Sequence, residues 1–260
     1  MRITASSAVL LAMLSAVAPG SVHAQARPDQ HALARDLAHG NAGERGHALA
    51  IARQMPPESI RPELRSALIA ELERAASLRK EARRRGVFLT ELIDPEYALG
   101  LSSVVADLGD PRAIPGLVGS LGAGYKVCRA LAMFGEQAAP LVLDAVRSLE
   151  ETAQIDDALL VLRFMVEGAA GQPLSAATLQ QIRSVADRRL TGRQHVTTLW
   201  NAMDLAMALN DSGLQQIVEA LASDRGEVIA RGVTEPDLIE KTQKLARDRL
   251  AGVPPLPRWN

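Results

Sequence analysis

Apolar residues recur at helical spacing along most of this 260-residue chain, and turns rich in glycine or proline separate the runs. Leu64 and Leu68 begin the clearest row, which predicts a long helix over 59–85 with one apolar face. Ser59 is expected to cap this helix and Gly86 to end it. About a dozen helices are expected in all, the later ones over 127–134, 137–149, 155–166, 175–190, 196–209, 214–222 and 234–250.

Composition favours the same all-α fold class. Hydrophobic residues make up 47% of the chain but aromatic residues only 3%, and alanine and leucine are abundant. With 23% charged residues, the chain is too apolar for intrinsic disorder. Residues 87–90 have strand character, but no second strand is available to pair with them, so we expect a linker or a helix edge there.

The turns repeat at regular intervals. The sequences Leu-Gly-Asp-Pro at 108–111 and Leu-Asn-Asp-Ser at 209–212 both place an aspartate between a helix stop and the next helix. Variants of this turn occur at Phe134 and Pro173. The spacing is 39 residues from Phe134 to Pro173 and 37 residues from Pro173 to Asn210. A period near 38 residues, built from helix pairs that each bury only one side, predicts an α-solenoid of antiparallel pairs.

One stretch resembles a known family. Residues 106–121 read Ala-Asp-Leu-Gly-Asp-Pro-Arg-Ala-Ile-Pro-Gly-Leu-Val-Gly-Ser-Leu, which resembles a HEAT repeat of the bacterial type, also called PBS-lyase HEAT-like. Residues 129–143 are similar to the next half-unit of that family. The resemblance implies an armadillo-like α-solenoid in which Asp110 and Pro111 are structural. HEAT repeats are a shape more than an activity, so it implies a binding scaffold and no chemistry.

The beginning of the chain predicts export. Residues 1–24 combine a positive start, an uncharged apolar run of 11 residues and small residues before Ala24, as in a signal peptide cleaved after Ala24 or Ala26. A membrane-spanning helix needs about 20 apolar residues, so no membrane segment is expected after cleavage. The mature protein is expected to be periplasmic or secreted.

The expected organisation is a signal peptide at 1–24, an N-terminal helical segment at 25–94, HEAT-like repeats at 95–250, and a proline-rich tail at 251–260. Because the helix at 59–85 is longer than a usual HEAT helix, stacking is expected to be irregular near the N-terminus.

Few residues suggest chemistry. His31, His39 and His47 recur every eight residues, whereas metal ligands on a helix prefer spacings of three or four. The single cysteine, Cys128, excludes a disulfide framework within the chain; it is either a buried structural residue or a link between molecules. No nucleophile elbow or phosphate-binding loop is present. We therefore expect no catalytic, metal or cofactor site, with a periplasmic enzyme or metal-binding protein using the histidine segment as the alternative.

The basic run at 79–85 is the most conspicuous local charge feature. Arg83, Arg84 and Arg85 lie near a helix C-terminus, where cations are favourable; they either form a solvated helix end or contact an acidic partner. The net charge of −1 and the scarcity of aromatic residues argue against nucleic acid.

Three further cations lie within or shortly after residues 106–121, the stretch that resembles a HEAT repeat. Arg112, Lys126 and Arg129 either bind a partner or serve packing and solvation. In the tail, Trp259 either folds back over the last helix pair or binds another protein. These residues complete the hypothesis of an exported, non-catalytic scaffold that binds another protein.

Overall fold

The computed structural model describes residues 28–149 and 151–255, where it contains thirteen α-helices, four short 3-10 turns and no strand. The all-α prediction is therefore confirmed. Within these residues, no helix combines the length and the hydrophobicity needed to cross a bilayer. The helices are α1 (Gln30–His39), α2 (Ala42–Ala52), α3 (Pro62–Arg85), α4 (Pro95–Leu108), α5 (Ile114–Gly119), α6 (Tyr125–Met133), α7 (Ala139–Ser148), α8 (Thr152–Val166), α9 (Ala176–Thr191), α10 (Val196–Leu209), α11 (Ser212–Ser223), α12 (Arg225–Ala230) and α13 (Pro236–Leu250); the 3-10 turns are η1 (Pro57–Ser59), η2 (Leu89–Glu91), η3 (Pro111–Ala113) and η4 (Gly135–Gln137).

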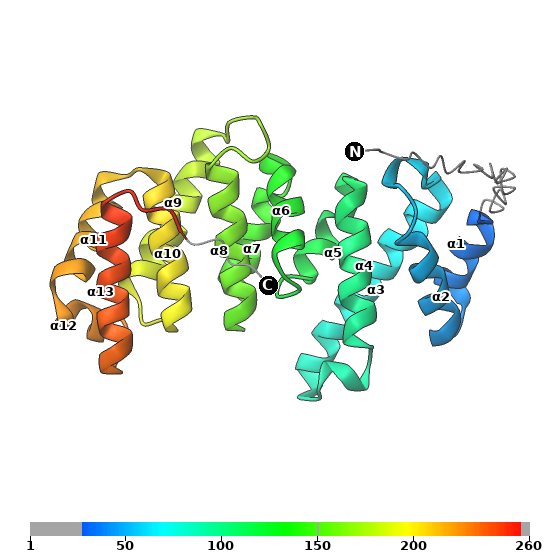
Figure 1. Cartoon of the computed structure of the whole chain (residues 1–260), viewed down its shortest axis with the longest axis horizontal. Helices are drawn as coiled ribbons and strands as arrows, with labels where there is room; N and C mark the ends of the chain where they lie inside the picture. Colours follow the sequence, from blue (N-terminus) through cyan, green and yellow to red (C-terminus); the bar gives the residue numbers. More distant parts are fainter. Residues whose placement is uncertain (1–27, 150, 256–260) are drawn as a thin grey trace, which may run out of the picture.

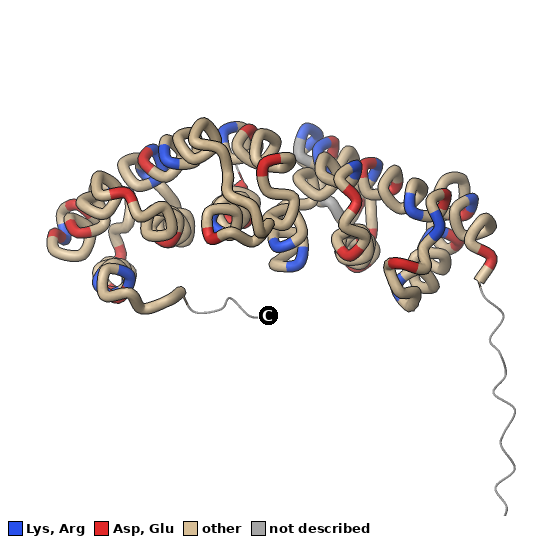
Figure 2. Tube along the Cα trace, turned by 90° about the horizontal axis from the view of Figure 1, so that it is seen from above, with Lys and Arg blue, Asp and Glu red and all other residues tan. Residues whose placement is uncertain are grey.

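The helices form two layers that follow the order of the chain (Figure 1). In one layer each of α1, α3, α5, α7, α9 and α11 packs against the next. In the other layer the same holds for α2, α4, α6, α8, α10 and α13. Seen from above, the molecule bends into an arc, and the layer that ends in α13 lies on its inner side (Figure 2).

Small aliphatic side chains fill the space between the layers. The buried core continues from Leu33 in α1 to Ala246 in α13, and leucine dominates its largest members. Helices α4 and α5 pack against α3, so the core runs through residue 94 without interruption. This construction explains the composition, because leucine, valine and alanine fill narrow helix–helix seams without aromatic rings.

The two aspartate turns are built alike. Gly109 and Asn210 both adopt left-handed backbone, with φ of 59° and 51°. Asp110 then accepts a hydrogen bond from the backbone N–H of Arg112, and Asp211 accepts one from that of Leu214. Each aspartate thus caps the element that follows it, as the sequence predicts.

Two glycines let α5 approach α3 closely. A Cβ on Gly119 would lie 2.6 Å from the Cβ of Ala76, and one on Gly116 would lie 3.0 Å from the side chain of Leu72. Real Cβ atoms do not approach other atoms so closely, so larger residues would separate the helices. Glycine at these positions is therefore explained by packing.

Some expected boundaries are wrong. Helix α3 begins at Pro62, and Ser59 ends the preceding 3-10 turn, where its hydroxyl donates to the carbonyl of Pro56. Helix α12 was not expected, because its six residues are too few for a periodic pattern. The stretch 87–90 forms no strand, as expected, and its last two residues begin η2. Residues 1–24, the cleavage positions Ala24 and Ala26, and Trp259 lie outside the described residues and stay predictions.

Candidate functional site

The basic run ends α3 as the sequence predicts. Arg84 lies 3.9 Å from the carboxylate of Glu81, and Arg85 forms a closer ion pair with the same carboxylate. Arg83 belongs to the same final turn of the helix. Exposed pairs within one helix stabilise it only slightly. These contacts therefore give Arg84 and Arg85 a local role at the helix end.

Arg112 is separated from the other two cations of its repeat. Its guanidinium donates to Asp110 at 2.7 Å and to the hydroxyl of Ser66 on α3 at 3.3 Å. The hydrogen bonds from Arg112 hold the pKa of the Asp110 carboxyl below its ordinary value. Arg112 thus joins its turn to α3, in the layer away from the inner side of the arc.

Lys126 and Arg129, in contrast, line one cavity of about 670 Å³ between α4 and α6. Lys126 pairs with Asp107 of α4 at 2.5 Å. Within the described part of the chain, the Arg129 side chain has no hydrogen-bond or ion-pair partner. We call this cavity the inner groove; it is lined by Ala106, Asp107, Gly109, Tyr125, Lys126, Arg129, Ala130, Met133 and Phe134.

The helix faces explain why the inner groove is both apolar and basic. Helix α6 buries Val127, Cys128, Leu131 and Ala132 against its neighbours, so its remaining positions face outward. Among these, Met133 is 57% exposed and Tyr125 38% exposed. The inner groove therefore offers exposed apolar surface beside an unpaired cation.

Aromatic and ionic contacts join the helices of the inner layer between α6 and α13. The rings of Tyr125 and Phe164 meet edge to face with centroids 5.5 Å apart, and the Arg163 guanidinium lies 5.4 Å from the Phe164 centroid. Asp204 of α10 accepts from Arg249 at 2.5 Å and lies 3.5 Å from Arg163. Because Asp204 and Arg249 are both buried, this pairing ties α8, α10 and α13 together.

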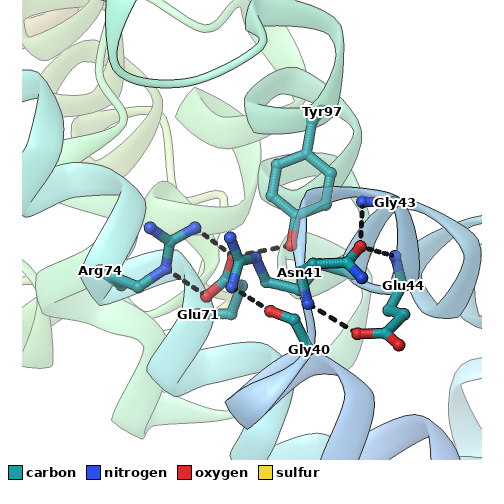
Figure 3. Close-up of polar contacts among 8 residues, drawn as sticks. Gly40, Asn41, Gly43, Glu44, Glu71, Arg74 and Tyr97 are labelled. Atoms are coloured by element: carbon teal, nitrogen blue, oxygen red, sulfur yellow. Dashed lines mark hydrogen bonds and ion pairs between the residues drawn. The ribbon is translucent and has the colours of Figure 1, made fainter.

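A second charged cluster lies near the other end of the chain, where α2, α3 and α4 meet (Figure 3). Glu71 of α3 is 4% exposed and accepts two hydrogen bonds of 2.6 Å from the Arg74 guanidinium. The Tyr97 hydroxyl donates to the same carboxylate at 2.7 Å, and Arg45 lies 3.7 Å from it. Burial, together with the Glu71 carboxylate, raises the pKa of Tyr97 above its ordinary value.

No family model, no curated protein and no solved structure matches this chain.

The Glu71 cluster borders a cleft of about 520 Å³, which we call the arginine cleft. It is lined by Ala42, Arg45, Gly46, Leu49, Ala50, Arg53, Arg74, Thr90, Glu91, Leu92, Ile93, Asp94, Glu96 and Tyr97. Reasoning from the sequence missed this site. One signal was available, because Glu71 stands three residues after Leu68, on the buried face of the long helix.

The remaining candidates for chemistry do not assemble into a site. His31, His39 and His47 are all exposed, and no group of three potential metal ligands occurs among residues 28–149 and 151–255. Cys128 is fully buried, as one of the two interpretations of the sequence expects. Burial and the neighbouring carboxyl of Asp157 raise the pKa of the Cys128 thiol. A thiol in this environment is a poor nucleophile.

Proposed function

We propose that this chain is an α-solenoid of antiparallel helix pairs, similar to HEAT and armadillo-like repeat proteins, and that it acts as a non-catalytic scaffold for another protein. The two layers support this architecture, because each helix contacts the next member of its own layer. The two matching turns, each a left-handed residue followed by a capping aspartate at Asp110 or Asp211, support a repeated unit. Solenoids of this kind bind partners along their concave surfaces.

The inner groove carries the functional proposal. Met133 and Tyr125 of α6 expose apolar surface there, 57% and 38% of each residue being accessible. Arg129 supplies a cation without a partner in the described structure. Exposed apolar side chains around an unpaired charge are typical of protein interfaces, where arginine and methionine are enriched.

The predicted signal peptide at 1–24 supports a location in the periplasm or outside the cell. The expected partner is a protein of that compartment, in keeping with the near-neutral charge of the chain. Arg84, Arg85 and Arg112 already have intramolecular partners, so the inner groove is the stronger candidate surface.

Cross-linking capture from an exported fraction tests this proposal. The purified mature chain and the Met133→Asp/Arg129→Glu variant would be compared as baits, with Arg188→Glu on the exposed face of α9 as the matched control. We expect a protein captured by the wild type and the control to be lost from the groove variant. Equal capture by all three baits would contradict the groove assignment. Stoichiometric metal in the purified chain would instead favour the alternative centred on His31, His39 and His47.

A further inference from the structure

The arginine cleft has an open floor. Ala42, Gly46 and Ala50 lie four residues apart on α2, so they form one stripe of small residues along the cleft. A Cβ added to Gly46 would meet no atom within 4 Å. The absence of side chains here leaves space above the helix backbone, in contrast to Gly116 and Gly119, where glycine permits packing.

One side of the arginine cleft is basic. Arg45 and Arg74 both approach the buried Glu71, and the Arg45 guanidinium also donates to the carbonyl of Gly40 (Figure 3). The Arg53 side chain extends along α4, where its guanidinium lies 3.4 Å from the Cβ position of Gly100. Within residues 28–149 and 151–255, the Arg53 side chain is exposed and has no hydrogen-bond or ion-pair partner. These three side chains leave excess positive charge toward the cleft.

The segment 90–97, which lines another part of the cleft, is acidic. Glu91 and Asp94 each use a carboxylate oxygen to accept a backbone N–H, from Phe88 at 3.2 Å and from Glu96 at 2.9 Å. Their charges remain, and the Glu96 side chain adds a third carboxylate. A polyanion would be repelled by this side of the cleft, and a neutral ligand would gain nothing from the exposed Arg53 guanidinium.

We propose that the arginine cleft binds a zwitterion of the peptide class: a short peptide whose terminal carboxylate lies against Arg53 and Arg45 and whose ammonium group lies toward Glu91 and Glu96. Arginine pairs well with carboxylates because its planar donors match their geometry. The volume of about 520 Å³ lies within the range of small-ligand sites. The proposal is independent of the scaffold function, because it uses different residues from the inner groove.

Calorimetric titration with the tripeptide Ala-Leu-Ala and its two blocked forms tests the ligand class. We expect saturable binding of the free tripeptide to the full-length mature chain. Amidation of its C-terminus should weaken binding at least about tenfold, because the carboxylate is lost, and N-acetylation should weaken it by removing the ammonium group. The proposal would be overturned if no binding were detected at a peptide concentration of about 10 mM. Equal binding of all three forms would also overturn it.

Two variants locate the site. Arg53→Gln should weaken binding of the free tripeptide about tenfold and leave the amidated form unchanged. Gly46→Leu should abolish binding by filling the open floor, while circular dichroism stays that of the wild type, because a Cβ at this position meets no other atom within 4 Å. Arg35→Gln on the exposed face of α1 is the matched control and should bind like the wild type. Unchanged binding by both cleft variants would place the peptide elsewhere. The groove variant Met133→Asp/Arg129→Glu should retain peptide binding, which separates this result from failure of the scaffold proposal.

Discussion

Glu71 shows how a single buried charge can organise three helices. Its carboxylate accepts hydrogen bonds from the Arg74 guanidinium of its own helix and from the Tyr97 hydroxyl of α4. Arg45 of α2 forms an ion pair with the same carboxylate. A buried carboxylate is costly to desolvate unless donors satisfy it. Here the donors come from α3 and α4 and a further cation from α2, so the charge also fixes how these three helices meet.

Replacing Glu71 by alanine should destabilise the protein by about 3 kcal/mol, because Arg74 and Tyr97 would lose their acceptor in a partly buried setting. Glu71→Gln should cost less, since an amide oxygen still accepts one hydrogen bond. Urea unfolding followed by circular dichroism measures both changes. Glu73→Ala, exposed on the same helix, is the control and should shift the midpoint little. A Glu71→Ala midpoint equal to that of the control would show that the cluster contributes nothing to stability.

At the scale of elements, the left-handed turn residues make a testable pair. Gly109 has φ of 59° and no atom within 4 Å of its Cβ position, so Gly109→Ala carries only a conformational cost. That cost should be about 1 kcal/mol, and Gly109→Asn should cost less, as Asn210 already occupies the matching turn. Gly46→Ala, within α2 and free of contacts, should instead stabilise the protein by about 0.5–1 kcal/mol. Thermal unfolding of the three variants would contradict this account if alanine had the same effect at both glycines.

Local patterns predicted the elements well and their long-range contacts poorly. The expected helix at 196–209 coincides with α10, because its apolar periodicity and its stop at Asn210 are properties of neighbouring residues. The start of α3 was placed too early, since the 3-10 turn before Pro62 carries no periodic signal. Tyr97 meets Glu71 across 26 positions of the chain, and no spacing rule for one helix identifies such a partner. Both the inner groove and the arginine cleft depend on contacts of this kind.

At the scale of the whole molecule, several carboxylates join successive parts of the arc. Glu136 accepts from the Thr178 hydroxyl and from Ser175, which holds η4 against the start of α9, and these hydrogen bonds lower its pKa. The hydrogen bond from Arg183 likewise lowers the pKa of Asp211, between α9 and α11. Depressed pKa values mean that the unfolded chain binds more protons in acid.

Stability from these carboxylates should therefore be fully present above the ordinary carboxyl pKa of about 4 and be lost as the pH falls through the lower pKa values of the folded state. We expect the urea midpoint to fall between about pH 5 and pH 3. Glu136→Gln should lower the midpoint at neutral pH and flatten this fall, while Glu219→Gln, exposed on α11, should leave the pH profile unchanged. Identical profiles for Glu136→Gln and the wild type would remove Glu136 from the acid response.

A row of helices in which each contacts only near neighbours should not be equally stable along its length. Helix α10 packs against α8, α9, α11 and α13, and an unbroken run of its residues from 201 to 206 is buried. Helix α1 contacts α2 and α3 and leaves its other side to solvent, so opening it exposes less core. Amide hydrogen exchange should accordingly be about 100-fold slower in α10 than in α1. If both helices exchanged at one common rate that followed the global free energy of unfolding, the chain would unfold as a single cooperative unit, and the neighbour-by-neighbour stability of a solenoid would not apply to it.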